Sequence, residues 1–176
     1  AVVGHSVGEV TSAYICGALT LADALRVSFH RSQLQQRVAG LGTMLAAGVD
    51  EDTANALTGL YDKISVAAVN SATNVTLAGD REQLQEIADT LTSQEIFNRL
   101  LQVEVAYHSY QMDSLETDLR ISLASIRPQK ECIPLYSTVF GSQVEGSTVN
   151  ADYWWMNVRQ PVAFERTIKQ LIDDGY

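Results

Sequence analysis

The sequence is poor in cysteine and in long apolar runs, and each shortage excludes a class of protein. Cys16 and Cys132 are the two cysteines among 176 residues, and they lie too far apart to form a zinc motif or a disulfide framework. No stretch of about 18 apolar residues is present, so no transmembrane helix is expected. No basic start precedes an apolar run, so no signal peptide is expected either. These absences favour a protein of the reducing cytoplasm that has no metal site.

Positive charge is also scarce. Lysine and arginine number 12 against 21 aspartates and glutamates, which gives a formal net charge of −9. This balance argues against nucleic acid or an anionic membrane as partner, because both are bound through basic patches. A small anionic substrate stays possible because it requires only local positive charge. The content of 46% hydrophobic and 19% charged residues is typical of a globular protein, either one domain or one domain with an insertion.

The spacing of apolar residues changes twice and divides the chain into three parts. Residues 1–42 begin with the end of a buried strand at residues 2–3, followed by helices to about residue 18 and over residues 21–38. Residues 43–104 follow the order strand–helix–strand–strand–helix–strand, the ferredoxin-like pattern. Residues 105–176 return to helical runs with one apolar strand. The sequence therefore predicts an α/β protein that carries a small inserted α+β subdomain.

Capping residues and apolar runs predict the individual elements. The expected helix starts with capping residues are Thr20 with Asp23, Asp50, and Asp80 with Gln83. The expected extended segments are residues 44–49, 64–69, 74–78, 96–105 and 133–140. Further helices are expected after His108 and from Pro161.

Ser6 is the first candidate catalytic residue. It is the centre of Gly-x-Ser-x-Gly, directly after a strand and before a helix, which is the pattern of a nucleophile elbow. We expect the turn to be too tight for side chains at Gly4 and Gly8, so that the serine projects at a helix N-terminus where negative charge is favoured. The N–H of Val7 would be one oxyanion donor. The alternative is a glycine-rich turn with a passive capping serine.

Arg31 is a charged residue on the apolar side of a helix. Its neighbours on that side are apolar, whereas the polar side carries Arg26, His30 and Arg37. An inward guanidinium is unfavourable unless it finds a partner, and its planar fork matches a carboxylate. The sharper interpretation is an anchor for a substrate carboxylate. A structural ion pair, or a side chain that extends to the surface, is the alternative.

His108 is the candidate base among three histidines. It follows an extended run and precedes a helix, a common position for a catalytic base. His30 is expected on the polar side of its helix, and His5 is expected to support the site because adjacent residues of an elbow point apart. A buried histidine with only structural contacts is the alternative for His108. Asp113 could be imagined as a third member of a triad but carries little weight.

Together these residues resemble the acyltransferase domains of type I polyketide synthases and animal-type fatty acid synthases. The free-standing relatives of these domains are the malonyl-CoA:acyl-carrier-protein transacylases. The matching segments are residues 4–9 (GHSVGE), Arg31, residues 66–79, residues 105–109 (VAYHS), residues 153–155 (YWW) and residues 157–162 (NVRQPV). Arg31 lies 25 residues after Ser6, the spacing at which the family keeps its carboxylate-binding arginine.

The resemblance implies a fold and a reaction. The fold is an α/β-hydrolase-like large subdomain with the ferredoxin-like subdomain inserted, and the active site lies in the cleft between them. In the reaction, His108 deprotonates Ser6, which takes the acyl group of malonyl-CoA and passes it to the phosphopantetheine thiol of an acyl carrier protein. Arg31 would hold the malonyl carboxylate. The implied partners are acyl-CoA, an acyl carrier protein domain and neighbouring synthase domains, and no bound cofactor is implied.

The family also suggests which residues select the substrate. Val7 and Tyr107 occupy positions that bound the acyl pocket, and small residues there accompany α-methyl substrates. Both are bulky here, which favours malonyl over methylmalonyl, although one methyl group is worth only about 1–3 kcal/mol in such a pocket. His5 and Asn70 are expected just behind the reacting groups.

Three alternatives and two missing parts accompany this interpretation. The alternatives are a free-standing transacylase, a serine hydrolase with an acid between serine and histidine, and a non-catalytic docking fragment.

We expect the family's upstream glycine-rich loop, which supplies the second oxyanion donor, to lie outside these residues. The main chain that orients the histidine is expected outside them too. The isolated piece is therefore predicted to be unstable and inactive.

Overall fold

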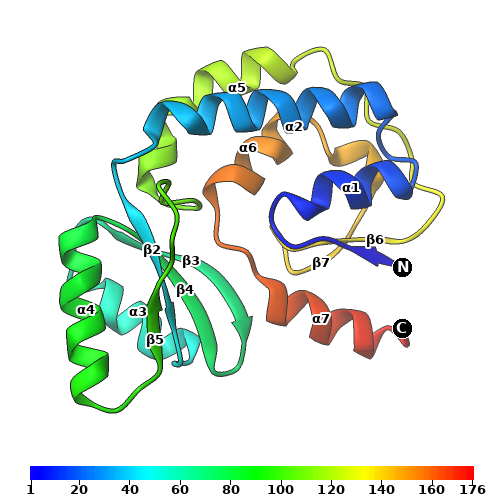
Figure 1. Ribbon diagram of the computed structural model, residues 1–176. Helices are drawn as coiled ribbons and strands as arrows, with labels where there is room; N and C mark the ends of the chain where they lie inside the picture. Colours follow the sequence, from blue (N-terminus) through cyan, green and yellow to red (C-terminus); the bar gives the residue numbers. More distant parts are fainter.

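The computed structural model describes all residues 1–176 and contains two sheets, each with its own helices (Figure 1). The larger sheet is antiparallel, has the order β3-β4-β2-β5, and is formed by β2 (Thr43–Ala47), β3 (Ile64–Ser71), β4 (Asn74–Gly79) and β5 (Asn98–Leu100). Its helices are α3 (Glu51–Thr58) and α4 (Arg81–Ser93). Element order and strand order together confirm the predicted ferredoxin-like subdomain.

Alternation along the strands gives this sheet two different faces. Leu45 on β2 and Leu77 on β4 are fully buried in a cluster with Leu84 and Ile87 of α4. Because successive strand residues point to opposite sides, Met44 faces the other way. It packs in a separate small cluster against the chain that leads to His108. The sheet thus uses one face for its own core and the other to support the candidate base.

The second sheet contains the N-terminal strand, and Ser6 follows that strand in the chain. It has the order β1-β6-β7, formed by β1 (Val2–Val3), β6 (Leu135–Ser137) and β7 (Ser142–Val144), and β1 is parallel to β6. Around it lie α1 (Gly8–Ile15), α2 (Leu21–Gln35), α5 (Glu116–Leu123) and α6 (Ala151–Arg159). Figure 1 shows α2 and α5 side by side, and Arg37, just after the end of α2, forms an ion pair with Asp118 of α5. No helix of the chain has the combination of length and hydropathy that a membrane span requires.

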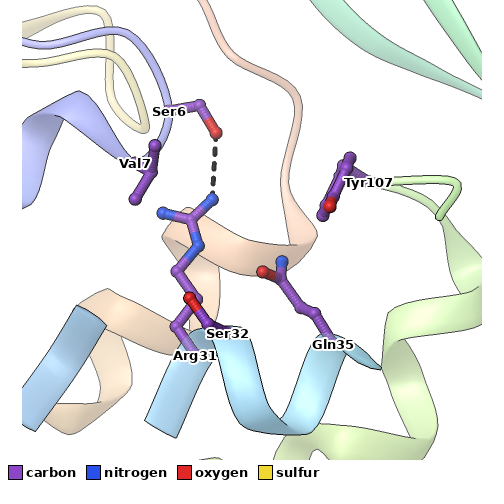
Figure 2. Close-up of a pocket in the computed structure, with 6 residues that line it drawn as sticks. All are labelled: Ser6, Val7, Arg31, Ser32, Gln35 and Tyr107. Atoms are coloured by element: carbon purple, nitrogen blue, oxygen red, sulfur yellow. Dashed lines mark hydrogen bonds between the residues drawn. The ribbon is translucent and has the colours of Figure 1, made fainter. Parts of the chain in front are cut away.

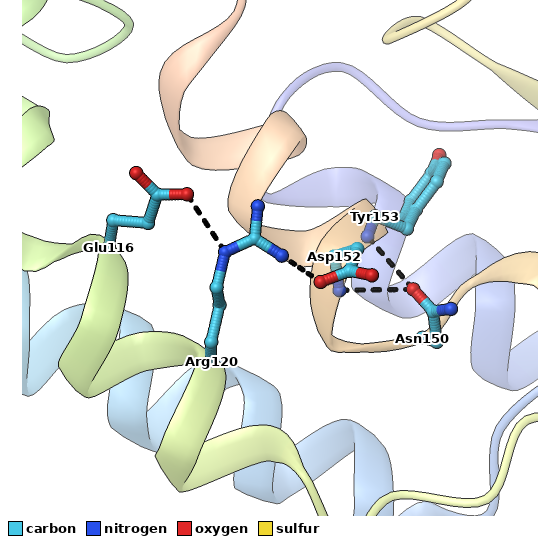
Figure 3. A network of polar contacts seen from close by, with 5 residues as sticks. All are labelled: Glu116, Arg120, Asn150, Asp152 and Tyr153. Atoms are coloured by element: carbon cyan, nitrogen blue, oxygen red, sulfur yellow. Dashed lines mark hydrogen bonds and ion pairs between the residues drawn. The ribbon is translucent and has the colours of Figure 1, made fainter.

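A network of polar contacts fixes α6, the helix that reaches the site (Figure 3). The side chain of Asn150 caps it by accepting hydrogen bonds from the N–H groups of Asp152 and Tyr153, at 3.0 and 3.1 Å. Arg120 of α5 pairs with Asp152 and also donates to Glu116 at 2.9 Å. The cap and the ion pairs hold the first turn of α6 against α5.

The chain after α6 crosses to the ferredoxin-like sheet. Val162 donates to the carbonyl of Ala67 and accepts from the N–H of Val69, both at 2.9 Å. The last helix, α7 (Phe164–Asp173), follows directly. The expected helix start at Pro161 is therefore wrong, because the backbone of Val162 is committed to β3 and a helix begins only after it.

Other elements are shorter than predicted. α1 ends at Ile15 instead of residue 18, because Gly17 adopts φ 83° and breaks the helix. The helix expected over 21–38 is α-helical to Gln35 and ends as a 3₁₀ turn, Gln36–Val38. The extended segments 96–105 and 133–140 form ladders only at Asn98–Leu100 and Leu135–Ser137, where partner strands exist. His108 is followed first by a 3₁₀ helix, Tyr110–Leu115, and then by α5.

Candidate active site

Ser6 lies on a strained turn between β1 and α1. Its backbone has φ 53°, in the left-handed region that residues other than glycine rarely adopt, and this conformation costs about 1–3 kcal/mol. Gly4 is required, because a Cβ there would lie 2.3 Å from the carbonyl carbon of Gly8. The prediction that Gly8 is also required is wrong: a Cβ at that position would have nothing within 4 Å.

His108 is positioned to take the proton of Ser6. Its Nε2 lies 2.7 Å from Ser6 Oγ, and its Nδ1 lies 2.9 Å from the main-chain oxygen of Gln160. A carbonyl can only accept, so Nδ1 carries the proton and Nε2 is left as the acceptor for the serine hydroxyl. The main-chain group that orients the histidine therefore belongs to this chain, and the expectation that it lies outside is wrong.

The environment of His108 keeps it neutral. The residue is 4% exposed, and its backbone φ is 59°. Burial, followed by the positive charge of Arg31, lowers the pKa of His108 from 6.5 to about 3. An uncharged imidazole with a free Nε2 lone pair is the form that a general base requires.

Arg31 reaches the serine from the middle of α2. It is buried at 4% exposure and donates from Nη2 to Ser6 Oγ at 2.9 Å (Figure 2). Its Nη1 donates to Asn157 Oδ1 at 2.7 Å. No carboxylate forms an ion pair with it. Burial lowers its pKa to about 10, so it stays charged at neutral pH. The structural ion pair considered above is absent, and the guanidinium lies beside the nucleophile.

The sequence did not single out the buried carboxylate behind the site. Glu9 is 1% exposed and accepts hydrogen bonds from the backbone and hydroxyl of Thr138, from Tyr153 at 2.6 Å and from Asn157 at 2.8 Å. Burial raises the pKa of Glu9, and these hydrogen bonds oppose that rise. Asn157 also donates to the main-chain oxygen of Ser6 at 3.2 Å. It thus joins the elbow, the arginine and the carboxylate.

A pocket of about 370 Å³ opens in front of Ser6. Figure 2 shows the residues that line it, which are Ser6, Val7, Arg31, Ser32, Gln35 and Tyr107. Val7 and Tyr107, predicted to bound an acyl pocket, lie on opposite sides of it. The N–H of Val7 donates no hydrogen bond within the chain, so it is free to bind an oxygen of a ligand.

The remaining candidates lie around this centre. His5 Nε2 lies 2.8 Å from Asn70 Oδ1, which joins the elbow to β3, and neither side chain forms a hydrogen bond with the side chain of Ser6 or His108. Asp113 forms an ion pair with Arg159 at 2.5 Å, and His108 Nδ1 is bonded to Gln160 instead, so Asp113 is no triad acid. No group of three or more histidine, cysteine, aspartate and glutamate side chains is arranged to hold a metal ion.

Comparison with known proteins identifies the family. The family model described as acyl transferase domain matches residues 1–176. Among curated proteins, the pikromycin polyketide synthase component PikAIII of Streptomyces venezuelae is 37% identical over 177 residues, and the chain spans 11% of its length.

Two solved structures are similar along almost the whole chain. The acyltransferase domain of module 8 of the salinomycin polyketide synthase is 30% identical with a TM-score of 0.95, and the alignment covers 98% of this chain and 41% of that one. The acyltransferase domain of the polyketide synthase PpsC of Mycobacterium tuberculosis is 35% identical with a TM-score of 0.92, covering 98% and 54%. These matches confirm the predicted fold class.

Proposed function

Because this chain belongs to the acyl transferase domain family, we propose that it forms the central part of a polyketide synthase acyltransferase that uses malonyl-CoA. The acyl group would pass to the phosphopantetheine thiol of an acyl carrier protein. One observation carries the proposal: Ser6 Oγ lies within 2.9 Å of both a neutral histidine nitrogen and a buried arginine. A nucleophile, its base and a carboxylate anchor are what transfer of a dicarboxylic acyl group requires.

The first half-reaction loads the serine. His108 Nε2 takes the hydroxyl proton while Ser6 Oγ forms a bond to the thioester carbon, and the oxyanion that develops is bound by the N–H of Val7. The carbon–sulfur bond then breaks, and the proton passes from His108 to the CoA thiolate. The carbonyl of Gln160 supports the imidazolium that forms in between, because it accepts from Nδ1.

The second half-reaction reverses these roles. The carrier-protein thiol gives its proton to His108 while its sulfur bonds to the acyl carbon. The bond between that carbon and Ser6 Oγ then breaks, and Oγ takes the proton back from His108. Throughout, Arg31 would hold the free carboxylate of the acyl group. A monoacyl group would leave that buried cation without its partner, which favours a dicarboxylic substrate.

Val7 and Tyr107 support malonyl over methylmalonyl. Both line the pocket beside Ser6 and Arg31, so a branch on the α-carbon would have to fit between an isopropyl group and a phenol ring. The expected preference is about tenfold, the effect of one methyl group in such a pocket. Loading from an equal mixture of malonyl-CoA and methylmalonyl-CoA tests it, and an excess of the methylmalonyl adduct would contradict it.

The test of the function is the intact mass of the full-length protein after incubation with malonyl-CoA. We expect a malonyl-sized adduct that is absent in Ser6→Ala and strongly reduced in His108→Ala. Addition of a phosphopantetheinylated acyl carrier protein should remove the adduct and increase the mass of the carrier. If the folded protein forms no adduct with any acyl-CoA, a non-catalytic docking role replaces this proposal.

A further inference from the structure

Gln35 is a buried polar side chain that faces the substrate pocket and has no strong partner. It is 7% exposed at the last residue of α2, four residues after Arg31. Its Nε2 lies 4.0 Å from the sulfur of Met112, a weak acceptor, and its side chain makes no other hydrogen bond. Figure 2 shows the carboxamide pointing into the pocket, between Arg31 and Tyr107.

A role in folding does not explain this placement. A buried amide without good partners is unfavourable, whereas an apolar residue could contact Met112 without that penalty. The neighbouring Gln33 and Gln36 are exposed, so glutamine in this region otherwise stays in water. An unpaired donor that faces an open pocket is expected where a ligand supplies the acceptor.

The hydrogen bonds that Arg31 already makes indicate which part of the ligand Gln35 would bind. Two nitrogens of Arg31 donate to Asn157 and Ser6, so only part of the guanidinium is left for a bound carboxylate. A carboxylate has two oxygens with about four lone-pair sites, and it favours several donors. Residues four apart on a helix lie on the same side, so Arg31 and Gln35 can reach one group together.

We propose that Gln35 donates a hydrogen bond to the free carboxylate of the acyl group and acts with Arg31 as a two-residue clamp. This inference rests on the proposed function, since it presumes a dicarboxylic acyl group on Ser6. Gln35 is then a substrate-binding residue that raises the preference for dicarboxylic over monoacyl groups. Acetyl-CoA, which lacks the carboxylate, gains nothing from it.

The experiment compares loading of malonyl and acetyl groups on the full-length protein. Rates of acyl-enzyme formation are measured by intact mass for wild type, Gln35→Met and Gln35→Glu, with Gln33→Met as an exposed control on the same helix. Methionine keeps the length of the side chain and removes the donor. Glutamate keeps the shape and places a negative charge opposite the substrate carboxylate.

We expect Gln35→Met to lower the malonyl loading rate at low substrate concentration about tenfold, the value of one hydrogen bond to a charged group. Acetyl loading should stay within about twofold of wild type, and Gln35→Glu should lower the malonyl rate further. Gln33→Met should change neither. Equal losses for both acyl groups, or an unchanged ratio of malonyl to acetyl loading, would overturn the clamp.

The wild type separates this inference from the proposed function. If wild-type protein forms no malonyl adduct, the proposed function fails and the clamp fails with it. If wild type loads malonyl and both Gln35 variants keep its preference, only the clamp fails. If Gln35→Met does not fold, the ratio of malonyl to acetyl loading in Gln35→Glu still tests the clamp, because glutamate keeps the size of the native side chain.

Discussion

Replacing the Glu9 carboxylate with an amide of the same shape should make α1 and α6, the two helices that it joins behind the active site, open more easily. In the native protein four donors from Thr138, Tyr153 and Asn157 converge on its two oxygens. Glu9→Gln leaves one oxygen and adds an NH₂ group, so two of the four donors lose their acceptor. If the remaining oxygen faces Thr138, the NH₂ group faces Asn157, whose own donor then has no acceptor.

The expected loss follows from these contacts. A hydrogen bond to a charged group contributes about 1.5–3 kcal/mol, so losing two costs roughly 3–6 kcal/mol. Removing a buried charge offsets part of this, because burial disfavours the carboxylate. We therefore expect α1 and α6 to open about 3 kcal/mol more easily. That corresponds to amide exchange about 100-fold faster.

Hydrogen exchange measured by mass spectrometry on the full-length protein reports this locally. Peptides from α1 (Gly8–Ile15) and α6 (Ala151–Arg159) should exchange faster in Glu9→Gln, whereas peptides from α4 should not. Glu86→Gln, an exposed residue on α4, is the matched control and should change nothing. Protection of α1 and α6 within about 0.5 kcal/mol of that control would refute the reasoning.

Two further predictions concern the base and the elbow. Because the pKa of His108 is lowered to about 3, the neutral base persists as pH falls from 7 to 5, so malonyl loading should keep its rate well below pH 6.5. Arg31→Gln removes a positive charge and should move this acid limit upward, and a wild-type limit near 6.5 in a pH–rate profile would contradict the prediction. Gly4→Ala should abolish loading, whereas Gly8→Ala should load normally, because only the first added Cβ meets backbone. Equal loss in both variants by intact mass would count against this account of the turn.

Local signals predicted the scaffold because they depend on near neighbours. The capping residues Asp50 and Asp80 accept the backbone hydrogen bonds expected of them, at 2.8 to 3.1 Å. The ferredoxin-like subdomain followed from the order of strand and helix patterns over residues 43–104. Arg31 could be singled out because a charge on an apolar helix face contradicts its surroundings.

The rest of the site depends on contacts between residues far apart in the chain. Asn157 reaches Ser6 across 151 residues, and Gln160 reaches His108 through a main-chain oxygen that no side chain identity encodes. Glu9 lies in the first turn of α1, where an acid is expected simply to face the positive end of the helix dipole. Gln35 looked like one of several polar residues at the end of α2. Only the tertiary structure brings these residues to their partners.

The short crossing from α6 to β3 makes the alignment of the base depend on the arrangement of the two sheets. Gln160 is tied at one end to α6, through its N–H to the carbonyl of Met156 at 2.8 Å, and two residues later Val162 is paired to β3. The position of the Gln160 carbonyl, 2.9 Å from His108 Nδ1, is therefore set from both sides, by α6 and by β3. The orientation of the imidazole is thus coupled to the packing of the ferredoxin-like sheet, because the oxygen that accepts from His108 Nδ1 lies two residues before the chain pairs with β3.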